Sequence, residues 1–330
     1  MENKLANEIL NILFQYRRII HQQRNCQQNC TKCLFPHFSK VLAFIKKNDP
    51  ITFVLPAFPG KSPNLHKVIS HLPDMGEQLA LNFLNQICEQ IAQIYPPGGK
   101  IKICSDGRVF SDLIGISENA ITEYQKAIMQ IISESNLTHL STFHLDDICS
   151  ENNFDKLRED LMYQFGDTLE NLRDKVLRGS KLSSQQEHID AHRLYCGMTR
   201  FLAEDAAFPG QTKSRNLIQK ESRAKAYHVI LRSNAWSELI AQRFPESVRL
   251  SIHPQSCGAK KLGIRLIGEE SWGTPWHGVV VKMNEKFFLL KRVEAENLGA
   301  KLVYSPLGIP SYYELRAQEQ NYQSLSYSEA

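Results

Sequence analysis

Residues 51–55 (Ile-Thr-Phe-Val-Leu) form a short apolar run between Pro50 and Pro56. A run of this length with prolines at both ends predicts a strand buried on both faces. Further along, apolar runs alternate with segments of helical periodicity, in the order 77–94 (helix), 101–104 (strand), 118–134 (helix) and 139–143 (strand). Strands that alternate with helices are typical of crossover units. We therefore predict an α/β fold built on a Rossmann-like, mostly parallel sheet.

The segments on either side of this region have other patterns. The N-terminal residues predict a helix over 3–24, a turn rich in cysteine, and a second helix over 38–47. Residues 154–243 are almost wholly helical in pattern and form a helical insertion. Short runs between Gly/Pro turns predict an antiparallel C-terminal elaboration, with strands at 248–252, 263–267, 278–282 and 286–291. We divide the chain into an N-terminal helical arm (1–48), an α/β domain (49–315) and a polar tail (316–330).

Composition and charge exclude several classes of protein. Of the 330 residues, 42% are hydrophobic and 22% are charged, which allows a sizeable core and rules out a disordered, collagen-like or coiled-coil chain. The formal net charge of +4 is too small to indicate a nucleic-acid partner. No apolar stretch approaches the roughly 20 residues of a membrane span, and the first residues do not resemble a secretory signal. We expect a cytoplasmic protein, with no nucleic-acid or membrane partner, whose eight cysteines are reduced.

Polar side chains follow the first two predicted strands. Ligands of open α/β sheets bind at the carboxyl ends of parallel strands, and the first strand runs into a proline-stiffened loop with Lys61, Ser62 and Asn64. Lys61 is a candidate anchor for a phosphate or carboxylate, although a solvated lysine in a stiff connection explains the same residue. The spacing is not that of a P-loop. After the second strand, Asp106 and Arg108 suit a zwitterionic ligand, or else an Asp-Gly turn closed by a local ion pair.

Basic residues of the second half are further candidates for binding an anion. The stretch 215–232 carries Arg223 and Arg232 in a run of cations, which is a solvated face unless these two side chains turn inward. Arg249 lies on the strand predicted at 248–252, and Lys261 follows that strand.

Two histidines of the last third are candidate proton carriers. His253 shares one face of its strand with Arg249, opposite the apolar residues, and His277 lies beside Trp276 where another strand begins. A histidine titrates near neutral pH and suits a general base or acid, although either residue also fits a structural role held by hydrogen bonds. We expect both strands in the C-terminal sheet, so that both histidines line one pocket with an indole wall from Trp272 or Trp276.

Cys26, Cys30 and Cys33 have the Cys-x3-Cys-x2-Cys spacing of radical S-adenosylmethionine enzymes. In that class the triad follows the first barrel strand, whereas here it follows a helix. Two other interpretations stay open: free surface thiols, or a structural zinc ion with His21 or His37 as the fourth ligand.

Four motifs follow one another along the chain: LPAFPGKSPN (55–64), CSDGRVFSDLIGI (104–116), RLSIHP (249–254) and TPWHG (274–278). As an ordered set they resemble the pyoverdine/dityrosine biosynthesis family, the isonitrile (isocyanide) synthases, and segments 193–205 and 232–236 fit the same pattern. The resemblance covers roughly residues 50–315.

This resemblance implies a reaction of secondary metabolism. The α-amine of L-tyrosine or L-tryptophan becomes an isonitrile, with C2 of ribulose 5-phosphate as the new carbon. The amine attacks the ketone to give an imine, and proton transfers and two C–C scissions follow, so the enzyme is a carbon–carbon lyase. The resemblance also implies that a non-haem iron, 2-oxoglutarate oxygenase acts next on the product. We expect no metal and no cofactor, with ribulose 5-phosphate as co-substrate.

Such chemistry needs anion anchors, an aromatic pocket and groups that move protons. His253, His277 and Asp106 are the candidate proton carriers; Lys61 is grouped with them, but not as a Schiff-base lysine, because the substrate's own amine forms the imine. The candidate substrate-binding residues are Ser62, Asn64, Arg108, Arg223, Arg232, Arg249, Lys261 and Trp276. Two alternatives stay open: a radical S-adenosylmethionine enzyme, and a protein that binds a sugar phosphate and an amino acid without turnover.

Overall fold

The computed structural model describes residues 1–20, 26, 30–148, 153–181, 185–208, 210–267 and 273–315. Its centre is a five-stranded sheet of order β3-β2-β1-β4-β5 in which all neighbouring strands are parallel. The strands are β1 (Ile51–Pro56), β2 (Gly99–Cys104), β3 (Leu140–Phe143), β4 (Val248–Ser251) and β5 (Leu262–Gly263). The predicted parallel α/β sheet is confirmed.

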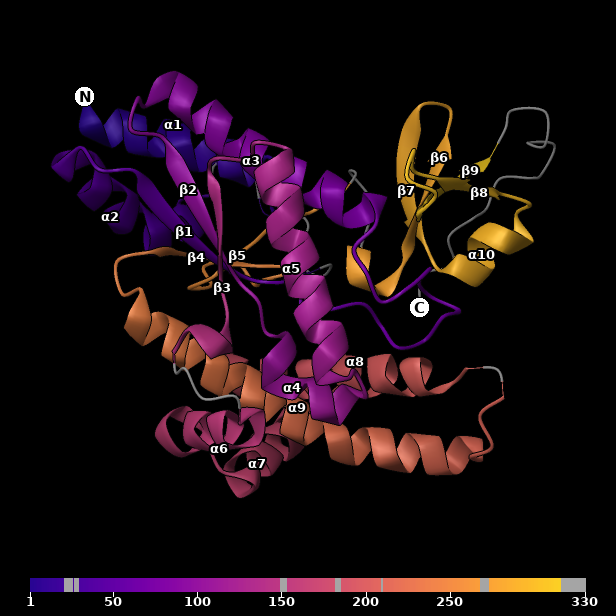
Figure 1. Cartoon of the computed structure of the whole chain (residues 1–330). Coiled ribbons are helices and arrows are strands. Elements are labelled where there is room, and N and C mark those ends of the chain that lie inside the picture. The colour runs from indigo at the N-terminus through magenta and orange to yellow at the C-terminus, as the bar shows by residue number, and fades with distance from the viewer. Residues whose placement is uncertain are drawn as a thin grey trace.

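Helices cover both faces of this sheet, as Figure 1 shows. The alternation of side chains along β1 explains why: Phe53 and Leu55 enter one hydrophobic cluster and Val54 enters the other. The first cluster contains residues of α1 (Glu2–Phe14), α2 (Thr31–Lys47), α3 (Met75–Ile94) and α5 (Glu118–Glu134). The second contains residues of α4 (Gly107–Ile114), α6 (Phe154–Phe165), α8 (Gln186–Ala206) and α9 (Arg215–Arg243), and α7 (Leu169–Ser180) packs on α8 and α9. A short 3-10 turn, η2 (Leu145–Asp147), follows β3.

A second, four-stranded sheet follows the first, with order β7-β6-β9-β8. It consists of β6 (Val279–Met283), β7 (Lys286–Leu290), β8 (Lys301–Tyr304) and β9 (Pro310–Leu315), with η3 (Pro275–His277) before it and α10 (Arg292–Asn297) within it. The pairs β6–β7 and β8–β9 are antiparallel and β6–β9 is parallel, so the C-terminal elaboration is mixed. Our assignment of strand 248–252 to this sheet was wrong, because β4 pairs with β1 in the parallel sheet.

The N-terminal arm is part of the main core. Its first helix ends at Phe14 rather than at 24, and the chain then runs extended, with the backbone N–H of Arg18 donating to the oxygen of Gly263 at 2.8 Å. Isolated bridges join Arg17 to Ile264 and Ile19 to Gln255. The helix prediction failed here because residues up to 20 keep an apolar period but satisfy their backbone groups against β5 and the loop before it. His21, Trp272 and the tail 316–330 lie outside the described residues.

None of the helices in the described part of the chain has both the length and the apolar character needed to span a bilayer.

Candidate active site

The carboxyl ends of the parallel strands converge on one edge of the sheet. From β1 the chain continues to β2 on one side, whereas β4 lies on the other side of β1, so β1 and β4 flank a topological switch point. Ligand sites of open α/β sheets lie at such points. The residues that leave the strands at this edge include Phe58, Asp106, His144 and His253.

The loop after β1 is held tightly against the start of α4. Phe58 has a left-handed backbone (φ 59°), and its carbonyl accepts a hydrogen bond from the Ser105 hydroxyl at 2.8 Å. A Cβ on Gly107 would lie 1.9 Å from the carbonyl oxygen of Pro59, so only glycine fits there. The motifs after β1 and β2 are therefore two halves of one packed unit.

Lys61 lies inside this unit and not in solvent. Its side chain is fully buried, and its ammonium contacts Asp74 and Glu77 at 2.8 Å each and donates to the Pro275 carbonyl at 3.0 Å. Burial disfavours the charged form, but the two carboxylates hold the pKa of Lys61 above its ordinary value. Burial raises the pKa of Glu77 to about 7, against the pull of Lys61. All three donors of Lys61 have protein acceptors, so the geometry gives no support to a substrate contact.

Ser62 and Asn64 tie the same loop to the end of α8. The Ser62 hydroxyl donates to Asp205 at 3.0 Å, and the Asn64 amide donates to the carbonyls of Glu204 and Ala207 at 3.1 and 3.3 Å. These bonds position the loop, and the predicted substrate contacts of both residues stay predictions.

Asp106 and Arg108, which follow β2, have different surroundings. Arg108 is buried and engaged by the carboxylates of Asp146 (2.9 Å) and Glu118 (2.7 Å), which braces η2 and α5 against α4. Asp106 is half-buried, and its Oδ1 atom is buried with no hydrogen-bond partner among the described residues. Burial raises the pKa of Asp106 to about 7, which suits a group that gives or takes a proton at neutral pH. The predicted joint recognition of a zwitterion by this pair has no support, because Arg108 is turned to internal carboxylates.

Arg249 and Lys261 form a cationic pair, and the charge of Glu238 acts on both side chains against the larger effect of burial. The hydroxyl of Ser237 on α9 accepts from Arg249 at 3.0 Å and from Lys261 at 2.8 Å. The Nε atom of Arg249 is buried without a partner, and neither cation has an ion pair among the described residues. Burial, and then the charge of Arg249, lowers the pKa of Lys261 to about 8. A buried guanidinium and a half-buried ammonium that share one neutral acceptor are suited to an anion.

Two histidines have lowered pKa values, and His253 lies close enough to Lys261 to be affected by its charge. Burial, then Arg18 and Lys261, lower the pKa of His253 to about 4. Burial also holds the pKa of His277 well below its ordinary value, with further contributions from Lys67, Lys61 and His253. The Nδ1 atom of His277 is buried and finds no hydrogen-bond partner in the part of the chain that the structure describes. His253 thus contributes to the lowered pKa of His277, although His253 follows β4 and His277 lies in η3 before the second sheet.

Aromatic side chains wall the space around His277. Its ring lies 4.4 Å from that of Phe201 on α8, and the Trp276 ring lies 5.1 Å from that of Phe58. Trp276 is itself buried, so it supports the wall from behind the loop after β1.

The two arginines of α9 have separate surroundings. Arg232 donates to Asp112 at 2.5 Å and to the Val109 carbonyl at 3.2 Å, which fixes α9 to α4. Arg223 is exposed and lines a groove of about 740 Å³ between α8 and α9, together with Arg200 and Arg215. A cavity of this size fits a small ligand. The substrate contact predicted for Arg223 stays a prediction and would place that ligand in this groove.

Sequence reasoning missed several residues that the fold brings to these sites. His144 follows β3 at the same edge and is buried, and within the described ranges neither of its ring nitrogens has a hydrogen-bond partner. Its position directly after a predicted strand was the available signal. Ser237, Phe201 and Cys257 had no such signal, because each is brought in from a distant element.

Three comparisons with known proteins agree with one another. Residues 41–303 match the family described as pyoverdine/dityrosine biosynthesis protein. The chain is 43% identical to an L-tryptophan isonitrile synthase of Fischerella ambigua, over 94% of this chain and 91% of that protein. It is 40% identical to an L-tyrosine isonitrile synthase of Xenorhabdus nematophila, over 98% of this chain and 95% of that protein. The crystal structure of the PvcA protein from Pseudomonas aeruginosa superposes with a TM-score of 0.87 at 39% identity, covering 94% of this chain and all of that one. The chain therefore belongs to the pyoverdine/dityrosine biosynthesis family.

Proposed function

We propose that this protein is an isonitrile synthase that acts on L-tyrosine or L-tryptophan. Relatives at about 40% identity over nearly the whole chain carry these two activities in their names. Within the structure, one observation supports the proposal most. The residues at or after the ends of β2 and β4 include two cations without an ion pair among the described residues, a histidine of lowered pKa, and a carboxyl whose Oδ1 has no described partner.

The carbon donor in this proposal is ribulose 5-phosphate. Arg249 and Lys261 bind its phosphate, since charge-assisted bonds to a phosphate are the strong ones and neither side chain makes an ion pair with a carboxylate among the described residues. The aromatic side chain of the amino acid lies toward Phe201, beside His277.

The chemistry requires proton transfers at nitrogen and carbon. The substrate amine attacks C2 of the ketose, water leaves, and an imine forms; cleavage of the two C–C bonds at C2 then leaves that carbon on nitrogen. Asp106 is suited to both directions of transfer because its pKa is about 7, whereas His253 and His277 are unprotonated at neutral pH and serve as bases. We infer a carbon–carbon lyase that works in the cytoplasm and whose product is taken up by a non-haem iron, 2-oxoglutarate oxygenase.

Incubation with each aromatic amino acid and ribulose 5-phosphate labelled with ¹³C at C2 tests the proposal. We expect a product that has gained one labelled carbon and lost two hydrogens at nitrogen, with one of the two amino acids preferred. A protein that binds the sugar phosphate and the amino acid but yields no labelled product contradicts it and favours the non-catalytic alternative.

A further inference from the structure

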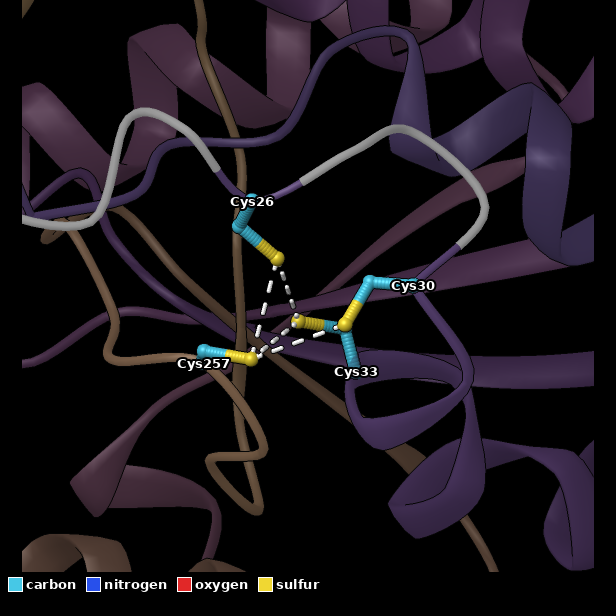
Figure 2. A group of neighbouring side chains, drawn as sticks. All are labelled: Cys26, Cys30, Cys33 and Cys257. Atoms are coloured by element: carbon cyan, nitrogen blue, oxygen red, sulfur yellow. Dashed lines mark hydrogen bonds between the residues drawn. The ribbon is translucent and has the colours of Figure 1, made fainter.

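Four cysteines from two distant parts of the chain meet at one point. Figure 2 shows Cys26, Cys30 and Cys33, between α1 and the first turn of α2, and Cys257, in the loop between β4 and β5. All four sulfur atoms lie within 4.8 Å of one another. Cys33 and Cys257 are 3.3 Å apart, and Cys26 and Cys30 are each 3.6 Å from Cys257.

These separations exclude some arrangements and fit another. A disulfide needs about 2.05 Å between sulfurs, so none of the four is paired in that way. Tetrahedral zinc with Zn–S bonds of about 2.3 Å places its sulfur ligands about 3.8 Å apart. The cluster needs to open by only a few tenths of an ångström to accept one ion at its centre.

We propose that Cys26, Cys30, Cys33 and Cys257 bind one structural zinc ion. The spacing of the first three matches that of zinc sites, in which neighbouring ligands are two to four residues apart. Cys257 takes the place that the sequence suggested for a histidine, and His37 is buried in α2 outside this group. A closed set of four thiolates, with no open position, is typical of structural rather than catalytic zinc.

The surroundings of the cluster suit its charge. Four thiolates around one Zn²⁺ carry a net charge of −2, which nearby donors must offset. The guanidinium of Arg17 lies 3.9 Å from the Cys26 sulfur and also donates to the Cys26 carbonyl. The Cys33 backbone N–H donates to the Cys30 carbonyl at 3.0 Å, which fixes the turn that carries both thiols.

The same geometry argues against a radical S-adenosylmethionine cluster. That cluster is held by three thiolates and leaves one iron open for its cofactor, whereas here a fourth thiol fills the set. Four irons and their sulfides also need far more room between the thiolates than one ion does.

The ion connects the N-terminal arm to the candidate active site. Cys257 lies four residues after His253 and four before Lys261, in a loop whose Gln255 pairs with Ile19. Zinc at this point fixes the loop that carries both side chains, without contacting the substrate. The proposal stands apart from the reaction, because metal content is measured without turnover.

Metal analysis of the native protein, grown with zinc and purified without chelators, is the primary test. We expect one zinc per chain, released by a thiol-specific mercurial, and a tetrahedral thiolate spectrum when cobalt(II) replaces it. Cys257→Ser is expected to lose most of the zinc and to melt at a lower temperature. Cys196→Ser is the matched control, since Cys196 is exposed on α8, outside the cluster, and this variant is expected to retain its zinc.

Three results overturn the proposal. One is native protein that contains no zinc and takes up no cobalt(II). Another is iron with acid-labile sulfide in its place. The third is a Cys257→Ser variant with as much zinc as the Cys196→Ser control. Because the first two are measured on native protein, they hold even if Cys257→Ser fails to fold.

Discussion

Two sets of basic side chains at the sheet end have opposite surroundings. Lys61 and Arg108, the paired set, are buried against carboxylates that come from α3, α5 and η2. Arg249 and Lys261, the open set, share only the neutral hydroxyl of Ser237. In sequence both sets are cations near strand ends. The difference shows that position at a strand end predicts where a charge lies, whereas the carboxylates that arrive from elsewhere decide whether it is available to a ligand.

The largest effect on turnover is expected for Asp106 and His277, which each have a buried atom without a hydrogen-bond partner among the described residues. Replacing Asp106 by Asn or His277 by Ala removes a proton carrier and is expected to lower turnover by roughly 10²–10⁴. Single-turnover rates measure this, with His71→Ala as the control because His71 is exposed and pairs with Glu123. Near-wild-type rates in both variants would assign proton transfer to other groups.

Stability separates the paired set from the open set. Lys61→Met leaves Asp74 and Glu77 buried without their cation, and removing one partner of a buried pair costs roughly 3–5 kcal/mol. Arg249→Met leaves no carboxylate unpaired among the described residues, so its free energy of unfolding is expected to stay near that of the native protein. Urea denaturation measures the free energy of unfolding of both variants. Equal decreases would contradict the difference between the paired and the open set.

For sugar-phosphate affinity we expect the opposite order, in which substitutions in the open set have the larger effect. Arg249→Ala and Lys261→Ala each remove a bond worth roughly 1.5–3 kcal/mol and weaken ribulose 5-phosphate binding by ~10- to 150-fold. Calorimetry measures the affinity. Arg223→Ala tests the groove between α8 and α9 instead; a loss in this variant alone would move the phosphate to that groove.

The smallest effect concerns pH and stability. The pKa of Asp106 is about 7 in the folded protein against an ordinary 3.8, so the folded state binds more protons between these values. Its stabilising contribution is complete below pH ~4 and is lost as the pH rises through 7. Asp106→Asn lacks this loss. We therefore expect its melting temperature, relative to that of the native protein, to be higher at pH 8 than at pH 5. If the melting temperatures of the two proteins change equally with pH, the raised pKa of Asp106 is contradicted.

The sequence predicted the parallel sheet well because its signals are local. The apolar run at 51–55, bounded by prolines, became β1, and the helix predicted over 118–134 has those bounds in the structure. The placement of β4 failed because strand order depends on pairing with a strand almost two hundred residues earlier.

For the candidate site, residue types were predictable and partners were not. Strand alternation places Arg249 and Ser251 on one face of β4, opposite Val248 and Leu250, which enter the first hydrophobic cluster. His253 lies beyond the end of β4, so its place on the face of Arg249 stays a prediction. The engagement of Lys61 by Asp74 and the arrival of Cys257 at the other three cysteines are tertiary contacts. No local pattern encodes them.

The short strand β5 has a consequence for how the molecule behaves in a crowded solution. An outer strand with free backbone groups is a template on which another chain can add and aggregate. Here the extended segment after α1 occupies that side, through the bridges of Arg17 with Ile264 and of Ile19 with Gln255. The segment that contains Arg17 thus covers this edge of the sheet, and another chain cannot add a strand there.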